Sequence, residues 1–265
     1  VTMQIQQLEN ELHANLFERN GKRIRLSAAG QEFLKYAYQI SKYETMAINH
    51  FHRTEEPEGN LNIGIMETLC SSEYTDLFYT FQEKYPKISL RLEVVTTLKA
   101  MEDLDKGIFD VIFLLDKTII RPNWKTARTF PSDISFFCAR SHPLAGQKNV
   151  SLERLLQERF ILTEKGCNYR QVFENDLATA GLHLECAMEI GHTSYIINAV
   201  SRLLGIGLLP VFTLKDALSR GEISLIDVDS YQIQLAMQVI YNTQRRISLP
   251  LQVFLSELGH SCFPE

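Results

Sequence analysis

Three short patterns follow one another within the first thirty residues, and together they restrict the fold more than any other part of the chain. The first is an amphipathic helix whose apolar positions recur at i, i+3 and i+7, namely Ile5, Leu8 and Leu12. Its opposite face is uncharged and rich in amides, and it carries Met3, Gln6, Gln7 and Asn10. A longer helix is predicted from about residue 28, because residues 31–53 contain neither Gly nor Pro.

A basic hairpin is predicted between these two helices. Asn20-Gly21 is a strong two-residue turn signal, since both residue types tolerate positive φ. The segment from Phe17 to Leu26 has one acid, Glu18, against four bases, which are Arg19, Lys22, Arg23 and Arg25. Such a helix and hairpin suit DNA, because amides pair with base edges and basic side chains hold phosphates. The same residues also fit a solvated helix followed by a charged turn, because short basic turns are common.

The spacing of these residues resembles the winged helix-turn-helix of LysR-type transcriptional regulators. The matching positions are Val1-Thr2, Gln4-Ile5, Leu8-Glu9, Leu12, Leu16-Phe17, Arg19, Leu26-Ser27, Ala29 and Gly30. His13 departs from the glycine usual in the family, and Ser27 replaces a threonine. The resemblance implies that Thr2, Met3 and Gln6 of the recognition helix face operator DNA. It also implies that three residues of the wing hold phosphates, namely Arg19, Lys22 and Arg23.

The family pattern places two more helices and a turn before the recognition helix, and this chain has no Met at position 1. Without those helices, the apolar stripe of the recognition helix lacks the surface that it would cover. The sequence is therefore either a fragment of a longer gene product or a degenerate copy. We interpret it as a fragment, with a partial winged helix-turn-helix at residues 1–30.

Residues 31–58 are predicted to form a long linker helix. Six residues follow one another at alternating spacings of four and three, and all but Glu44 are apolar. They are Phe33, Ala37, Ile40, Glu44, Ala47 and Phe51. This heptad seam fits either a helix packed on its own domain or a dimerisation helix. Few neighbours are available to cover so long a run, which favours dimerisation. The family resemblance implies the same, as a homodimer or a dimer of dimers that binds a two-fold DNA site.

The formal net charge of the whole chain is −5, which is unusual for a DNA-binding protein. Residues 1–55 hold seven Lys/Arg and six Asp/Glu, a net charge of +1, which leaves −6 on the remainder. A locally basic module on an acidic body is compatible with DNA binding. No apolar run approaches the ~18–20 residues that cross a membrane, and the five cysteines form no Cys-x-x-Cys pair. A reducing cytoplasm and free thiols are therefore expected.

The residues after Glu55-Glu56-Pro57-Glu58-Gly59 predict an α/β domain, because strand and helix patterns alternate. Strands are predicted at 60–65, 88–95, 110–115, 160–163, 184–190 and 206–209. Helices are predicted at 73–85, 97–106, 151–157, 167–180, 193–204 and 249–258. Thr97 is the expected N-cap of the second of these helices, and Gly107 is expected to end it.

This body also resembles the effector domain of LysR-type regulators. The matching pieces are Gly59-x-Leu61-x-Ile63-Gly64, Phe81-x-x-x-Tyr85-Pro86, Leu104-x-x-Gly107-x-x-Asp110, His142-Pro143-Leu144-Ala145 and Gly205-x-Gly207-x-x-Pro210. The resemblance implies two Rossmann-like subdomains of periplasmic-binding-protein type across residues 59–265. Subdomain I would span about 59–135 and 240–265, and subdomain II about 136–239. Crossover strands are expected near 134–139 and 234–241, with a small-molecule effector held between the subdomains.

Several hydroxyl and thiol side chains follow predicted strands and precede predicted helices. Ligands in open α/β sheets bind beyond the carboxyl ends of strands, where helix N-termini offer free N–H groups. We therefore expect the effector to contact Thr68, Thr97, Cys167, Thr193 and Ser194. Each of them taken alone is more often a helix cap. A carboxylate or another small anion suits these donors, although Glu67 and Glu164 nearby oppose a strongly anionic ligand.

Cys167 precedes a predicted helix and lies three residues before Arg170. A cysteine in such a position can have a lowered pKa, which permits the hypothesis of a redox sensor. The interpretation that we favour is a small cap residue, with Arg170 in a structural ion pair.

The sequence shows no nucleophile elbow, Walker loop, paired acids on one helix or His-Glu-x-x-His motif. Gly205-x-Gly207 lacks the third glycine of a dinucleotide site, and no zinc spacing of Cys and His occurs. We therefore expect no enzyme, no cofactor and no metal. The predicted function is a DNA-binding regulator controlled by an effector. The alternatives are a ligand-binding module without DNA binding, because its DNA-binding domain is incomplete, and, more weakly supported, an enzyme of an unfamiliar kind.

Overall fold

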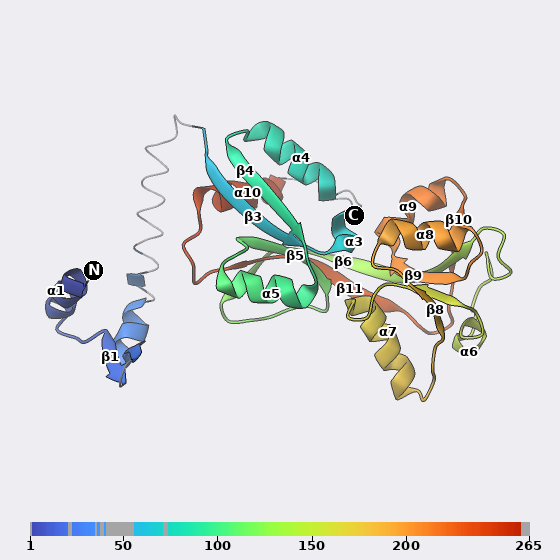
Figure 1. Cartoon of the computed structure of the whole chain (residues 1–265), viewed down its shortest axis with the longest axis horizontal. Helices are drawn as coiled ribbons and strands as arrows, with labels where there is room; N and C mark the ends of the chain where they lie inside the picture. Colours follow the sequence, from blue (N-terminus) through green and yellow to red (C-terminus); the bar gives the residue numbers. More distant parts are fainter. Residues whose placement is uncertain are drawn as a thin grey trace. The chain divides into compact units, whose positions relative to one another are not determined.

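A computed structural model of the chain describes residues 2–20, 23–34, 36–37, 40, 56–70 and 74–260 (Figure 1). The chain forms two compact units. One consists of residues 1–56 with 244–248, and the other of residues 57–243 with 249–265. Because the amino-terminal unit and the larger unit are separate bodies, each is described by itself.

The amino-terminal unit begins with helix α1 (Thr2–Leu12), as the apolar spacing predicts. Strands β1 (Phe17–Asn20) and β2 (Arg23–Leu26) form the predicted antiparallel hairpin, and a further helix begins at residue 28. Asn20 pairs with Arg23 in the ladder, so its predicted place in the turn is wrong. Of the heptad seam, Glu44, Ala47 and Phe51 lie outside the described residues.

Nine strands of the larger unit form one sheet with the order β4-β3-β5-β11-β6-β9-β7-β8, and β10 pairs with β6. At one end, β3 (Gly59–Ile65), β4 (Ile88–Val94) and β5 (Val111–Asp116) run parallel. At the other end, β7 (Phe160–Leu162), β8 (Cys186–Glu189) and β9 (Ile206–Pro210) run parallel. We call these two parts lobe I and lobe II.

Two long antiparallel strands join the lobes. They are β6 (Trp124–Ala139) and β11 (Ile233–Asn242), and they include both predicted crossover segments. In lobe I β11 pairs with β5, and in lobe II β6 pairs with β9 and with β10 (Ile223–Ile226). Residues 124–133 were not predicted as strand, because half of this segment is exposed, interrupted by Pro131, and lacks an apolar run.

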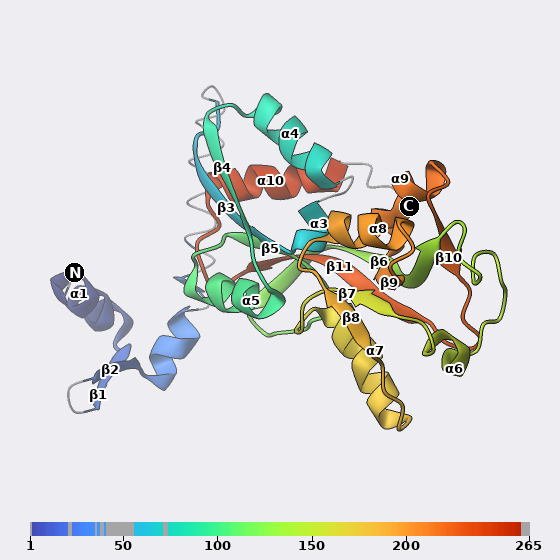
Figure 2. The same cartoon turned by 45° about the vertical axis from the view of Figure 1, so that its right-hand side comes forward.

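The core of lobe I is aromatic. Helices α4 (Tyr74–Lys84) and α10 (Leu249–His260) cover one face of the sheet, and α5 (Thr97–Lys106) covers the other (Figure 2). Phe254 of α10 is fully buried, and its ring centroid lies 5.1 Å from that of Phe81 and 6.2 Å from those of Phe78 and Phe113. The apolar face of α4 therefore packs into this shared aromatic core.

Lobe II has its own core. Helices α8 (Thr193–Ser201) and α9 (Val211–Ser219) lie on one face of the sheet and α7 (Asn168–Thr179) on the other, with the short α6 (Leu152–Leu155) at the periphery (Figures 1 and 2). Phe173 packs 4.9 Å from Phe136 and 5.8 Å from Phe160, measured between ring centroids. The sequence did not predict α9 or β10. Helix α9 follows β9 without a loop, so no turn signal marks its start.

No helix in the described ranges is both long and apolar enough to cross a lipid bilayer. The part of the chain that the structure describes also contains no group of three or more His, Cys, Asp or Glu that could hold a metal ion.

Candidate effector site and DNA-binding elements

The lobes meet where their parallel strands end. Strands β3 and β4 of lobe I, and β7 and β8 of lobe II, each lead into a segment that reaches the other lobe. This is the edge at which open α/β sheets bind ligands. The contacts across it are hydrogen bonds between two side chains or between a side chain and a backbone group, and all five predicted effector residues lie on these segments.

Thr68 lies on the short helix α3 (Glu67–Cys70), which directly follows β3. Its hydroxyl lies 3.4 Å from the phenol oxygen of Tyr169 on α7, and both residues are buried. Burial raises the pKa of Tyr169 well above its ordinary value, so the phenol stays neutral and able to donate. Thr68 is thus one of the polar groups that join the lobes.

Thr97 forms a second connection between the lobes. The side-chain amide of Asn168 on α7 donates to the hydroxyl of Thr97 at 2.9 Å and to the carbonyl oxygen of Leu115 at 2.8 Å. Asn168 is buried, and the sequence did not single it out. Because Asn168 reaches two elements of lobe I at once, it fixes the start of α7 against that lobe.

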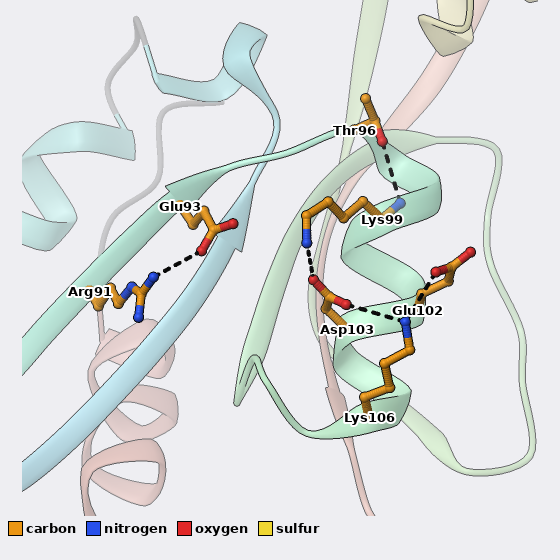
Figure 3. Close-up of polar contacts among 7 residues, drawn as sticks. All are labelled: Arg91, Glu93, Thr96, Lys99, Glu102, Asp103 and Lys106. Atoms are coloured by element: carbon orange, nitrogen blue, oxygen red, sulfur yellow. Dashed lines mark hydrogen bonds and ion pairs between the residues drawn. The ribbon is translucent and has the colours of Figure 1, made fainter.

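The predicted capping role of Thr97 is wrong, because the N-cap of α5 is Thr96. The Thr96 hydroxyl accepts from the backbone N–H of Lys99 at 3.4 Å (Figure 3). Asp103 of α5 is nearly buried between Lys99 and Lys106, and the hydrogen bond from Lys99 holds its pKa below the ordinary value (Figure 3). Since Thr96 caps the helix, the hydroxyl of Thr97 is available to Asn168.

The third connection centres on Glu67, which is the first residue of α3. Thr193 is almost fully buried, and its hydroxyl donates to Glu67 Oε2 at 2.6 Å. The backbone N–H of Thr193 lies 3.2 Å from both carboxylate oxygens. His192 Nδ1 lies 2.9 Å from Glu67 Oε1. A carboxylate from lobe I therefore occupies the N-terminus of α8 in lobe II.

Ser194 and Cys167 differ from the three threonines. Ser194 is exposed, and its hydroxyl lies 3.5 Å from His192 Nδ1. Cys167 is the N-cap of α7 but makes no side-chain capping hydrogen bond, and it is buried. The structure therefore brings Thr68, Thr97 and Thr193 into contacts between the lobes, whereas it places Ser194 beside them on the surface.

The less favoured hypothesis, a lowered pKa for Cys167, is wrong. Burial raises the pKa of this thiol, and the nearby charge of Glu164 acts in the same direction. Arg170 is buried and paired with Glu174 at 2.7 Å and Glu189 at 2.8 Å, which confirms its interpretation as a structural pair. Its guanidinium therefore serves the packing of α7 against β8, and Cys167 lacks the electropositive surroundings of a reactive thiol.

In the amino-terminal unit, backbone-directed hydrogen bonds join α1 to the hairpin. Glu9 Oε1 accepts from the backbone N–H of Leu16 at 2.6 Å and of Phe17 at 3.1 Å. The Ser27 hydroxyl donates to the carbonyl oxygen of Asn15 at 2.5 Å and accepts from the backbone N–H of Gly30 at 2.9 Å. These contacts explain physically why Glu9, Ser27 and Gly30 belong to the motif on which the resemblance rests.

Five of the six predicted DNA-contacting residues lie on the elements expected for them. Gln6 is exposed on α1, and Thr2 and Met3 form the first turn of the same helix. Arg19 lies in β1 and Arg23 in β2. Lys22 lies outside the described residues. On the apolar stripe, Ile5 and Leu8 are half-buried, and Leu12 is 41% exposed.

Both units match models of one protein family. Residues 1–31 match "Bacterial regulatory helix-turn-helix protein, lysR family", and residues 54–262 match "LysR substrate binding domain". The chain belongs to the LysR family. With these two domains, the protein is a transcriptional regulator with an effector-binding domain rather than an enzyme. Its curated relatives are named as regulators.

Relatives of this LysR-family regulator cover almost all of it. The uncharacterized HTH-type transcriptional regulator YwqM of Bacillus subtilis is 31% identical over 96% of this chain and 87% of that protein. The regulatory domain of CcmR from Synechocystis PCC6803, solved in complex with 2-PG, has a TM-score of 0.68, 24% identity, and covers 77% of this chain and 97% of its own. Full-length CbnR complexed with target DNA has a TM-score of 0.59 and 18% sequence identity. The match covers 98% of this chain and 88% of the CbnR chain. These likenesses confirm the α/β fold with two lobes.

Proposed function

We propose that this LysR-family regulator binds operator DNA through α1 and the β1–β2 hairpin. In this proposal Thr2, Met3 and Gln6 face base edges, and Arg19, Lys22 and Arg23 hold phosphates. The exposed amide of Gln6 and the hydrogen bonds that fix the hairpin against α1 support it. The domain division that follows is residues 1–30 for DNA, 31–58 for dimerisation, and 59–265 for the effector.

We infer that the effector binds between lobes I and II, in contact with Thr68, Thr97, Cys167, Thr193 and Ser194. The observation that carries this inference is the set of polar contacts between the lobes, to which Glu67 and Asn168 must be added. Hydroxyl groups and helix N-termini at one edge suit a small molecule with a carboxylate or another acidic group. The solved relative in complex with 2-PG supports a small molecule as the ligand class.

The regulator acts in this proposal as a homodimer, or as a dimer of dimers, in the cytoplasm where its operator lies. Two subunits joined by the helix at residues 31–58 present two recognition helices to a two-fold site. The solved relative in complex with target DNA supports operator binding. An effector shifts the protein between two conformations only if it binds one of them more tightly than the other. The hydrogen bonds between the lobes are contacts that can be present in one conformation and absent in the other.

The test is a fluorescence anisotropy titration of the full chain with a mixed-sequence DNA duplex at two salt concentrations. Affinity is expected to fall steeply with salt, and Arg19→Ala to reduce the slope of log K against log salt by about 1, because one phosphate contact is lost. Arg220→Ala is the matched control, because Arg220 lies at the end of α9 and pairs with Glu222. Equal slopes for wild type and both variants would refute the assignment of Arg19.

A further inference from the structure

We propose that Glu67 is an internal competitor for the effector. Its carboxylate holds the N-terminus of α8 while the effector is absent, and it must leave when an acidic effector binds there. This inference rests on the proposed effector site between the lobes. It makes Glu67 a residue that determines ligand specificity, and it makes the contact between α3 and α8 an autoinhibitory one.

The geometry of Glu67 is that of a bound ligand rather than of an ordinary helix cap. A usual N-cap side chain belongs to the helix that it caps, whereas His192, the N-cap residue of α8, makes no capping hydrogen bond. The capping group instead comes from a residue 126 positions away, in the other lobe. Whether the cap is present therefore depends on how the lobes are placed.

The donors that Glu67 occupies form a complete carboxylate-binding set. The Thr193 N–H lies 3.2 Å from both oxygens, the Thr193 hydroxyl donates to one of them at 2.6 Å, and His192 Nδ1 lies 2.9 Å from the other. Thr193 is 1% exposed, so its hydroxyl has no solvent to replace this acceptor. A small acid that enters this position meets the same donors, and it cannot share them with a second carboxylate.

Glu67 also differs in charge from the other connections between the lobes. The Asn168 amide, the Thr97 hydroxyl, the Leu115 carbonyl, and the hydroxyls of Thr68 and Tyr169 are all neutral. Among the described contacts between lobes I and II, the Glu67 carboxylate is therefore the anionic partner. An acidic effector replaces one carboxylate by another without adding charge at α8, and the displaced Glu67 releases the contact between α3 and α8.

The experiment removes the Glu67 side chain by mutation and then adds a small carboxylic acid that can take its place. Glu67→Ala removes a CH2–COO⁻ group, which has the size of acetate, so sodium acetate is the probe and sodium chloride at equal ionic strength is the salt control. The readouts are hydrogen exchange at the Thr193 amide and the thermal midpoint of the full chain. Glu222→Ala is the matched control, because Glu222 lies in lobe II and pairs with Arg220.

We expect the Thr193 amide to exchange at least tenfold faster in Glu67→Ala than in wild type, and acetate to restore its protection. Acetate should raise the midpoint of Glu67→Ala but leave wild type and Glu222→Ala unchanged, because Glu67 fills the position in both. Glu67→Gln keeps the side-chain volume and serves if Glu67→Ala fails to fold. Its weaker neutral acceptor should speed Thr193 exchange, and acetate should not reverse this.

Three outcomes would overturn the inference: unchanged Thr193 exchange in both variants, an equal effect of acetate on wild type and Glu67→Ala, or an equal effect of chloride. Binding of Glu67→Ala to the mixed-sequence duplex is measured in the same samples. Salt-dependent DNA binding without any acetate effect would refute the role of Glu67 and leave the proposed regulator intact. If wild type does not bind the duplex, the proposed DNA binding is refuted, whatever effect acetate has.

Discussion

Replacing Gly30 by alanine should disrupt the amino-terminal unit and leave the larger unit unchanged. A Cβ at this position would lie 2.0 Å from the carbonyl oxygen of Leu16, whereas ordinary contacts begin at 3.4 Å, so a backbone group must move by 1.4 Å. That carbonyl accepts from the backbone N–H of Ser27 at 2.9 Å, and Leu16 is buried. The carbonyl cannot turn away without giving up this hydrogen bond.

The size of the effect follows from three terms. Overpacking of this kind costs about 1–3 kcal/mol. The strained hydrogen bond to Leu16 adds about 1 kcal/mol, and the higher helix propensity of alanine returns about 1 kcal/mol. The net loss is about 1–3 kcal/mol, which accelerates exchange from the opened unit roughly 5- to 150-fold.

Hydrogen exchange followed by mass spectrometry measures both units of the full chain at once. Gly259→Ala is the matched control, because Gly259 lies in helix α10 and nothing lies within 4 Å of an added Cβ there. In Gly30→Ala, exchange should rise in α1 and the hairpin and stay constant in the larger unit, at residues 57–243 and 249–265. DNA binding should weaken with it. Unchanged exchange in α1, or equal changes in both variants, would refute the reasoning.

Three further predictions concern the larger unit. Cys167 should react with a thiol reagent at pH 8 much more slowly than the half-buried Cys186, because burial raises its pKa; comparable rates would contradict this. The pKa of Asp103 is depressed in the folded state, so the loss of stability in Asp103→Asn should be constant at neutral pH and shrink below about pH 4 in urea titrations; a pH-independent difference would contradict it. Gln238→Leu should cost about 1–3 kcal/mol in the same assay, because the buried Gln238 accepts from Ile119 N–H at 2.9 Å; wild-type stability would refute this.

Most of the fold could be predicted because its strands are marked locally. The apolar runs of β5 and β9 are buried along nearly their whole length, and the alternating β3 buries Leu61, Ile63 and Ile65. Strand β6 is different, since its first half pairs with β11 while exposing many side chains, and the partner lies about a hundred residues away. Pairing over such a distance leaves no periodicity in the sequence.

From the sequence, only those residues of the candidate site that directly follow a predicted strand could be identified. The hydroxyls of Thr68, Thr97 and Thr193 were identifiable because each follows a strand, although adjacent Thr96 and Thr97 could not be told apart as caps. Glu67 was considered only as a charge that opposes anionic ligands. Its role as acceptor at α8 depends on a contact across 126 residues, and the sequence carries no signal of that contact.

The way the lobes are joined explains how a small molecule can control this protein. Each lobe has its own aromatic core, with Phe254 in lobe I and Phe173 in lobe II. The described contacts at the strand ends are hydrogen bonds, which a ligand can replace one for one with little net change in free energy. Apolar packing offers no such exchange, because water or ligand in its place costs the full burial energy. In the proposed mechanism, an effector would act on the contacts of Glu67, Asn168 and Thr68 while both aromatic cores stay intact, and a change in lobe position would pass through β6 and β11, which join the lobes.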